Sequence, residues 1–109
     1  NSMITQDPLV QLEYNKDVYR HHWMSSPTYV GVIKESLRVR NEKHKFPVPT
    51  YFQLPEDDPV VSTPVTKKFI ESLNDKNVSF HIYENRKHEI YNDLRREEPL
   101  ADLKNFLMS

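Results

Sequence analysis

The stretch YFQLPEDDPVVS, residues 51–62, decides how the rest of the chain is interpreted. It opens with an apolar, β-favouring run, Pro55 interrupts that run, and three carboxylates follow at positions 56–58. Such a run is typical of a strand buried on both faces of a parallel sheet, and proline ends it because it lacks an N–H. The stretch predicts a strand over residues 50–54 that delivers acidic side chains into a tight turn.

A second strand and its loop follow downstream. Residues 78–83 alternate between apolar and polar, which indicates a strand nearer the edge of the sheet. The charged loop 84–88 then ends in His88. An acid after one strand and a histidine after the next is the order of the last two members of a Ser-Asp-His triad in an α/β-hydrolase. We therefore predict that an acid from the turn at positions 56–58 orients the ring of His88, that His88 is a general base, and that the two converge at one sheet edge.

Helix starts are marked by proline directly after a capping residue. In the first three helices, the capping residue is read as the N-cap and the proline as the first helical residue. The order from residue 48 is strand, helix, strand, helix, which predicts the α/β class. The predicted helices cover residues 8–14 after Asp7, 27–40 after Ser26, 64–73 after Thr63, and a terminal segment from about Pro99.

Apolar spacing within these helices predicts which side chains are buried. We expect Trp23 and Met24 to pack inward as well. Lysine and arginine line the opposite face of helix 27–40, so contact with a membrane surface is an alternative to packing within the domain. The predicted stripes are Val30, Ile33 and Leu37; Val65, Phe69, Ile70 and Leu73; and Leu100, Leu103, Phe106 and Leu107.

Composition narrows the functional classes. The 109 residues allow one domain at most, and a net charge of −1 argues against a nucleic-acid partner. No cysteine is present, so the chain has no disulfide framework and no thiol nucleophile. We expect a cytoplasmic location, which would be peripheral to a membrane if helix 27–40 binds one. No apolar run reaches transmembrane length, and no cofactor motif is found. Gly31 is the one glycine, so the chain holds no G-x-S-x-G nucleophile motif.

The chain resembles a known family along nearly its whole length. Residues 55–61, PEDDPVV, are similar to the G-x-x-D-x-h-V frame of the monoacylglycerol lipase and lysophospholipase family, the serine aminopeptidase-like α/β-hydrolases. Residues 87–89, KHE, resemble that family's loop ending in His-Glu. Upstream, residues 4–10 and 14–17 resemble its cap. Proline replaces glycine at position 55 and no glycine precedes His88, so both loops must take a somewhat different backbone shape.

The resemblance implies a division and an activity. Residues 1–46 are expected to form a helical cap, and residues 47–109 the C-terminal α/β unit of the hydrolase fold. The whole enzyme would hydrolyse lipid-like esters such as monoacylglycerols or lysophospholipids, with Asp58 and His88 as triad members. The nucleophile would come from a missing N-terminal half. The isolated chain would then be inactive, and would self-associate or pair with that half through its exposed sheet edge.

Alternatives remain open for the site. Asp57 competes with Asp58 as the acid, and a surface-loop histidine is the plain alternative for His88. A non-catalytic binding domain on a hydrolase-like scaffold, or a histidine–carboxylate metal protein, are alternative functions. Adjacent His21 and His22 point to different faces and make a poor zinc pair. The remaining polar residues are given supporting roles: Glu56 as a solvated turn residue, Glu89 as support for the His88 loop, His81 on the other face of its strand, and His44 in a charged linker.

Overall fold

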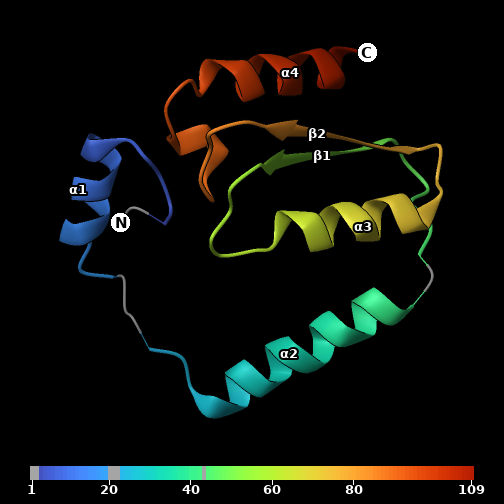
Figure 1. Ribbon diagram of the computed structural model, residues 1–109, viewed down its shortest axis with the longest axis horizontal. Helices are drawn as coiled ribbons and strands as arrows, with labels where there is room; N and C mark the ends of the chain where they lie inside the picture. Colours follow the sequence, from blue (N-terminus) through green and yellow to red (C-terminus); the bar gives the residue numbers. More distant parts are fainter. Residues whose placement is uncertain (1–2, 20–22, 43) are drawn as a thin grey trace.

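A computed structural model describes residues 3–19, 23–42 and 44–109. The strand-helix-strand-helix order predicted from residue 48 is confirmed, and two helices precede it (Figure 1). A short 3₁₀ turn separates the second strand from the last helix. The elements are α1 (Pro8–Lys16), α2 (Ser26–Asn41), β1 (Thr50–Pro55), α3 (Thr63–Leu73), β2 (Val78–Tyr83), η1 (Ile90–Asn92) and α4 (Glu97–Met108).

The two strands form a parallel sheet, with Phe52 opposite Phe80 and Leu54 opposite Ile82. Helix α3 connects them, because parallel neighbours need a crossover. Figure 1 shows α3 on one side of the sheet and α4 on the other. Both strands therefore end at the same edge, and the loops that follow them open side by side there.

Helices α1, α2 and α3 begin with the expected pairing of a capping residue and a nearby proline, and the cap lies one residue earlier than predicted in α2 and α3. Asp7 caps α1 as predicted, and its carboxylate accepts from the Leu9 N–H. The predicted caps Ser26 and Thr63 are wrong, because Ser25 and Ser62 take these positions. Proline lacks an N–H, so it suits either of the first two helical positions, and the earlier serine reaches the N–H of the third.

The two faces of the sheet differ in character. Phe52 and Leu54 lie on the side that faces α3, while Tyr51 and Gln53 lie on the other side with Tyr83. On that second side, the Gln53 amide donates to the Tyr83 hydroxyl at 2.9 Å, which donates to Asp102 of α4 at 2.7 Å. Burial, followed by the bond to Asp102, raises the pKa of Tyr83. The prediction of an apolar run on both faces thus missed a polar layer between the sheet and α4.

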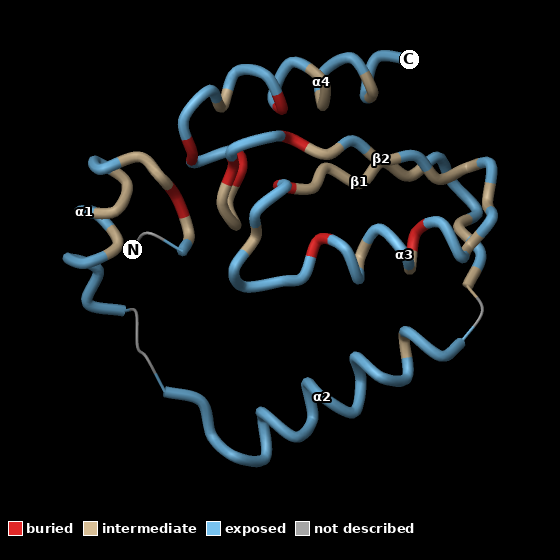
Figure 2. Tube along the Cα trace, in the orientation of Figure 1, coloured by how far each residue is buried: buried red, intermediate tan, exposed pale blue. Residues whose placement is uncertain are grey.

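Helix α2 buries none of its residues, and Figure 2 shows it exposed nearly throughout. The prediction that Val30, Ile33 and Leu37 pack inward is wrong, since each is exposed. Trp23, which is 85% exposed, and Met24 also fail to pack inward. A stripe is buried only where a second surface covers it. In the described structure, α2 shares an open groove with α3 along part of its length, from Val32 to Arg40.

The other predicted stripes are half right. Ile70 is buried, and Phe69, Leu73, Leu103 and Phe106 are partly buried. Helices α3 and α4 each have one covered side. The remaining members of the two stripes are exposed, namely Val65, Leu100 and Leu107. Terminal helix α4 also begins at Glu97, two residues before Pro99. No helix in the described part of the chain combines the length and hydrophobicity needed to cross a bilayer.

Candidate active site

The loops after β1 and β2 are joined by two adjacent side-chain pairs. Asp58 faces His88, with the Asp58 Oδ2 atom 2.9 Å and the Oδ1 atom 3.2 Å from His88 Nδ1. Their neighbours Asp57 and Lys87 form an ion pair at 2.8 Å. The structure thus brings Asp58 and His88 together at the carboxyl edge of the sheet, where parallel strands place their loops.

The surroundings of Asp58 keep its carboxylate ionised. Its side chain is only 6% exposed, and its Oδ1 atom accepts the backbone N–H groups of Val60 at 2.8 Å and Val61 at 3.0 Å. Burial alone would raise the pKa of Asp58, but the bonds from His88, Val61 and Val60 outweigh it and hold the pKa below its ordinary value. This Asx-type turn fixes the carboxylate before His88 reaches it.

The competing acid lies elsewhere. The Asp57 side chain is 75% exposed and its Oδ2 atom binds Lys87 Nζ rather than the imidazole. Glu56 also lies exposed in the turn, while its N–H donates to Tyr83 O and extends the ladder between the strands. Of the three carboxylates at positions 56–58, only Asp58 contacts the histidine ring.

The imidazole of His88 is held on one nitrogen and open on the other. An ionised carboxylate can only accept, so Nδ1 carries the proton in the bonded ring. In the part of the chain that the structure describes, no group bonds to Nε2, and the ring is 33% exposed. It borders a cavity of about 570 Å³, lined also by Tyr14, Tyr51 and Gln53. A neutral imidazole in this state presents a lone pair at Nε2, the atom that takes a proton in a triad.

The N-terminal segment fixes the backbone around His88. The N–H of His88 donates to Met3 O at 3.4 Å, and the N–H of Glu89 donates to Ile4 O at 2.9 Å. The loop has no glycine and turns instead at Asn85, whose φ of 53° is one that asparagine tolerates. The residues between β2 and η1 are therefore tied to a segment that lies more than eighty positions earlier in the chain.

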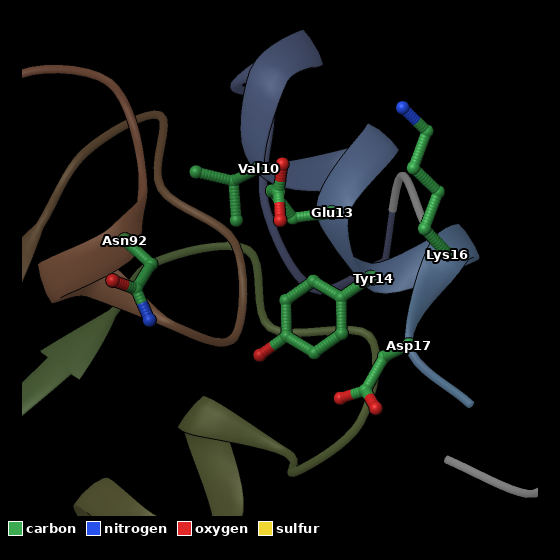
Figure 3. Close-up of a pocket in the computed structure, with 6 residues that line it drawn as sticks. All are labelled: Val10, Glu13, Tyr14, Lys16, Asp17 and Asn92. Carbon is green, nitrogen blue, oxygen red and sulfur yellow. The ribbon is translucent and has the colours of Figure 1, made fainter. Parts of the chain in front are cut away.

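Glu89 supports the loop by joining it to α1. The Tyr14 hydroxyl donates to Glu89 Oε1, and the Asn92 amide donates to Glu89 Oε2 at 2.8 Å. A pocket of about 520 Å³ next to these residues is lined by α1, Asp17 and Asn92, with Tyr14 beside Asn92 (Figure 3). It holds neither Asp58 nor His88.

Sequence reasoning missed three buried polar residues of the same loop region. Asp93 and Thr5 are fully buried, and Arg86 is 1% exposed and paired with Glu98 at 2.7 Å. Arg86 Nε has no hydrogen-bond partner among the residues that the structure describes. Each sits in a segment rich in charge and turn residues, so nothing in the local pattern marks it as buried. Thr5 and Asp93 contact each other from opposite ends of the sequence, and a short-range pattern carries no signal for such a contact.

The two other histidines that the structure describes, His44 and His81, stand apart from this pair. His44 contacts Val39 O at 2.8 Å, and His81 is exposed with its ring 4.4 Å from that of Tyr83. His21 and His22 lie outside the described residues. Across residues 3–19, 23–42 and 44–109, no group of three or more acidic or histidine side chains is arranged to hold a metal ion.

Comparison with known proteins gives one family. The sequence profile of the family described as serine aminopeptidase, S33, matches residues 1–95. This span contains α1, α2, the sheet and both loops of the Asp58–His88 pair. A search of curated proteins finds no match.

Proposed function

The chain belongs to the serine aminopeptidase S33 family of α/β-hydrolases, and from this membership we propose that it supplies the acid and the base of a Ser-His-Asp triad. The observation that carries the proposal is the contact of 2.9 Å between Asp58 Oδ2 and His88 Nδ1. The acid is nearly buried and fixed by backbone N–H groups, and the base keeps Nε2 open. Asp58 thus accepts the proton on His88 Nδ1, and Nε2 is left to accept a proton, as a general base for a serine hydroxyl requires.

In this mechanism His88 Nε2 takes the proton of the serine hydroxyl as the oxygen attacks the ester carbonyl. Asp58 holds the Nδ1–H tautomer and stabilises the imidazolium that forms. His88 then returns the proton to the departing alkoxide, and water repeats the sequence to release the acid. The chain has no G-x-S-x-G motif, and no serine among the described residues bonds to the His88 ring. In this proposal the nucleophile and the oxyanion donors come from outside this chain.

For the substrate we propose a lipid-like carboxylic ester, such as a monoacylglycerol or a lysophospholipid. This rests on the similarity of residues 4–10, 14–17 and 55–61 to the monoacylglycerol lipase and lysophospholipase branch. The exposed apolar side chains of α2 are compatible with an enzyme that meets long acyl chains. In this proposal residues 1–46 act as the cap over the site, and residues 47–109 as the α/β unit beneath it.

A second candidate is a non-catalytic binding domain that keeps the hydrolase scaffold. The feature that favours it is the lack of a nucleophile motif in a chain with one glycine. The two functions differ in one observable, because only a triad makes a serine reactive towards a phosphonate.

The test is serine-directed fluorophosphonate labelling of the gene product that includes the coding sequence upstream of Asn1. We expect labelling of one serine and hydrolysis of a p-nitrophenyl ester, both abolished by His88→Ala. Asp57→Asn is the matched control, since it removes a neighbouring carboxylate that does not contact the ring. Labelling that survives His88→Ala would remove His88 from the triad, and no labelling of the parent would favour the binding domain.

A further inference from the structure

We propose that Asp93 is the positioning residue for the base, holding the loop on which His88 approaches Asp58. This rests on the proposed function only in naming His88 the base, since the contacts that carry it are independent of any activity. Asp93 lies just after η1 and is fully buried, whereas Asp58 lies in a different loop. It touches neither the His88 ring nor Asp58 in the described structure, so it acts through the backbone.

The Asp93 carboxylate binds both segments that meet at the base. Its Oδ2 atom accepts the N–H of Lys87, the residue before His88, at 2.8 Å. Its Oδ1 atom accepts the N–H of Gln6 at 2.7 Å and that of Leu94 at 2.8 Å. The Thr5 hydroxyl lies 3.3 Å from the same oxygen. One buried side chain thus ties the His88 loop to the N-terminal segment and to its own turn.

The arrangement calls for a carboxylate. Lys87, Gln6 and Leu94 all offer N–H donors, and an ionised carboxylate accepts at both oxygens while an amide would turn an NH₂ group towards one of them. An unpaired buried charge is costly, but here each oxygen is bonded, so the charge is compensated by convergent backbone dipoles. A residue placed only to fill space would not need to be acidic at a fully buried position.

Three successive backbone N–H groups, those of residues 87–89, hold the His88 loop in place. Lys87 N–H is bonded to Asp93, His88 N–H to Met3 O, and Glu89 N–H to Ile4 O. Asp93 also bonds Gln6, two residues beyond Ile4, so the same carboxylate secures the segment that supplies those two carbonyls. Loss of Asp93 should therefore loosen both the His88 loop and the N-terminal segment that binds it. The contact between the His88 ring and Asp58 should then be formed for a smaller fraction of the time.

The test is the tautomer of His88 in the 109-residue chain labelled with ¹⁵N, read from long-range ¹H–¹⁵N correlations at mildly alkaline pH. In the parent we expect the proton on Nδ1. In Asp93→Asn we expect the ratio of the Nδ1–H to the Nε2–H form to fall about fivefold, the factor that one hydrogen bond of ordinary net strength contributes to an equilibrium. Asp57→Asn should leave the ratio at the parent value, because the exposed Asp57 carboxylate bonds the side-chain amine of Lys87 and not the His88 ring.

A second pair of variants guards against unfolding of Asp93→Asn. Thr5→Val removes the hydroxyl that donates to Asn92 O at 2.7 Å and approaches Asp93, while Thr5→Ser retains it. We expect Thr5→Val to lower the ratio in the same direction, and Thr5→Ser to keep it. A merely structural role would lower the thermal midpoint and leave the tautomer of the folded chain unchanged. An unchanged tautomer in folded Asp93→Asn, or in Thr5→Val if Asp93→Asn does not fold, overturns the positioning role. Absence of ester turnover in the longer gene product would instead overturn the proposed function and leave the tautomer result standing.

Discussion

Asp58→Asn separates the role of the charge from the role of the turn. The asparagine side chain of this variant keeps an oxygen at the Oδ1 position, so it can still accept from Val60 and Val61 N–H. The Oδ2 atom, 2.9 Å from His88 Nδ1, becomes an NH₂ group. An NH₂ donor facing Nδ1 forces that nitrogen to accept, so the ring proton moves to Nε2, where a base needs a lone pair.

The expected magnitudes for folding and catalysis differ widely. A hydrogen bond to a charged group contributes about 1.5–3 kcal/mol and a neutral one about 0.5–1.5 kcal/mol, so the swap should lower the free energy of unfolding by about 1 kcal/mol. The same change of tautomer in a triad lowers turnover roughly 10⁴-fold, which corresponds to about 5 kcal/mol of transition-state stabilisation. Asp58→Ala should cost more folding free energy, about 2–3 kcal/mol, because the two valine N–H groups also lose their partner.

Two assays check the argument. Urea unfolding of the chain measures the stability difference, and ester hydrolysis by the gene product with its upstream sequence measures turnover. The reasoning is refuted if Asp58→Asn retains turnover within a few-fold of the parent, or if Asp57→Asn is equally damaging. It is also refuted if Asp58→Ala and Asp58→Asn are equally stable, since the backbone N–H bonds would then contribute nothing.

Further outcomes are expected from the same contacts. The pKa of Asp58 lies below its ordinary value of 3.8, so the stability from its charged form is present above that value and is lost as pH falls through the lowered pKa; acid unfolding of Asp58→Asn should be less steep with pH in that range. Amide hydrogen exchange should be faster in α2, which buries no residue, than in β1 and β2, and equal protection would contradict the observed exposure. Light scattering should give the isolated chain a mass above 13.0 kDa, and Val30→Lys should shift it towards monomer if the exposed face of α2 drives association. Tyr83→Phe should lower the free energy of unfolding by about 1–2 kcal/mol, as Asp102 loses its donor, whereas Tyr29→Phe on exposed α2 should have no measurable effect.

Local patterns were sufficient to predict the strands and the loops that carry the pair. The apolar run over residues 50–54 lies within β1, which extends one residue further to Pro55, and the alternating residues 78–83 coincide with β2. The resemblance selected Asp58 by motif register alone. The contact between Asp58 and His88 follows from chain direction, because parallel strands deliver both loops to one edge. Nothing about Asp93 could be found in this way. Its burial depends on Thr5 and Gln6, which lie at the opposite end of the sequence, and periodicity reports only near neighbours.

The error on α2 has a different physical cause. Its stripe of Val30, Ile33 and Leu37 is real in the sequence, but a stripe states only that a helix can be covered. Coverage needs a partner surface. Val32 and Val39 of α2 line an open groove of about 540 Å³ together with Val65 of α3, and this groove is too open to bury the helix. The same argument explains why Val65, predicted to be buried in α3, is exposed.

The open edge of β1 bears on the source of the proposed nucleophile. Among the described strands, β1 pairs only with β2, so one edge of β1 has no strand partner even though its residues are half-buried. A further strand added parallel to β1 would satisfy those backbone groups, since a bare edge is a template for pairing.

Because all parallel strands point the same way, the loop that follows the added strand would open at the edge that holds Asp58 and His88. In the proposed function, that loop or one on a strand beyond it carries the serine whose proton His88 Nε2 accepts. Under the proposed function, one added segment would pair with the edge of β1 and carry the serine, so it should protect β1 from exchange and create a reactive serine together. If the longer gene product protects β1 yet leaves His88 Nε2 without a serine partner, the completed sheet serves binding rather than hydrolysis.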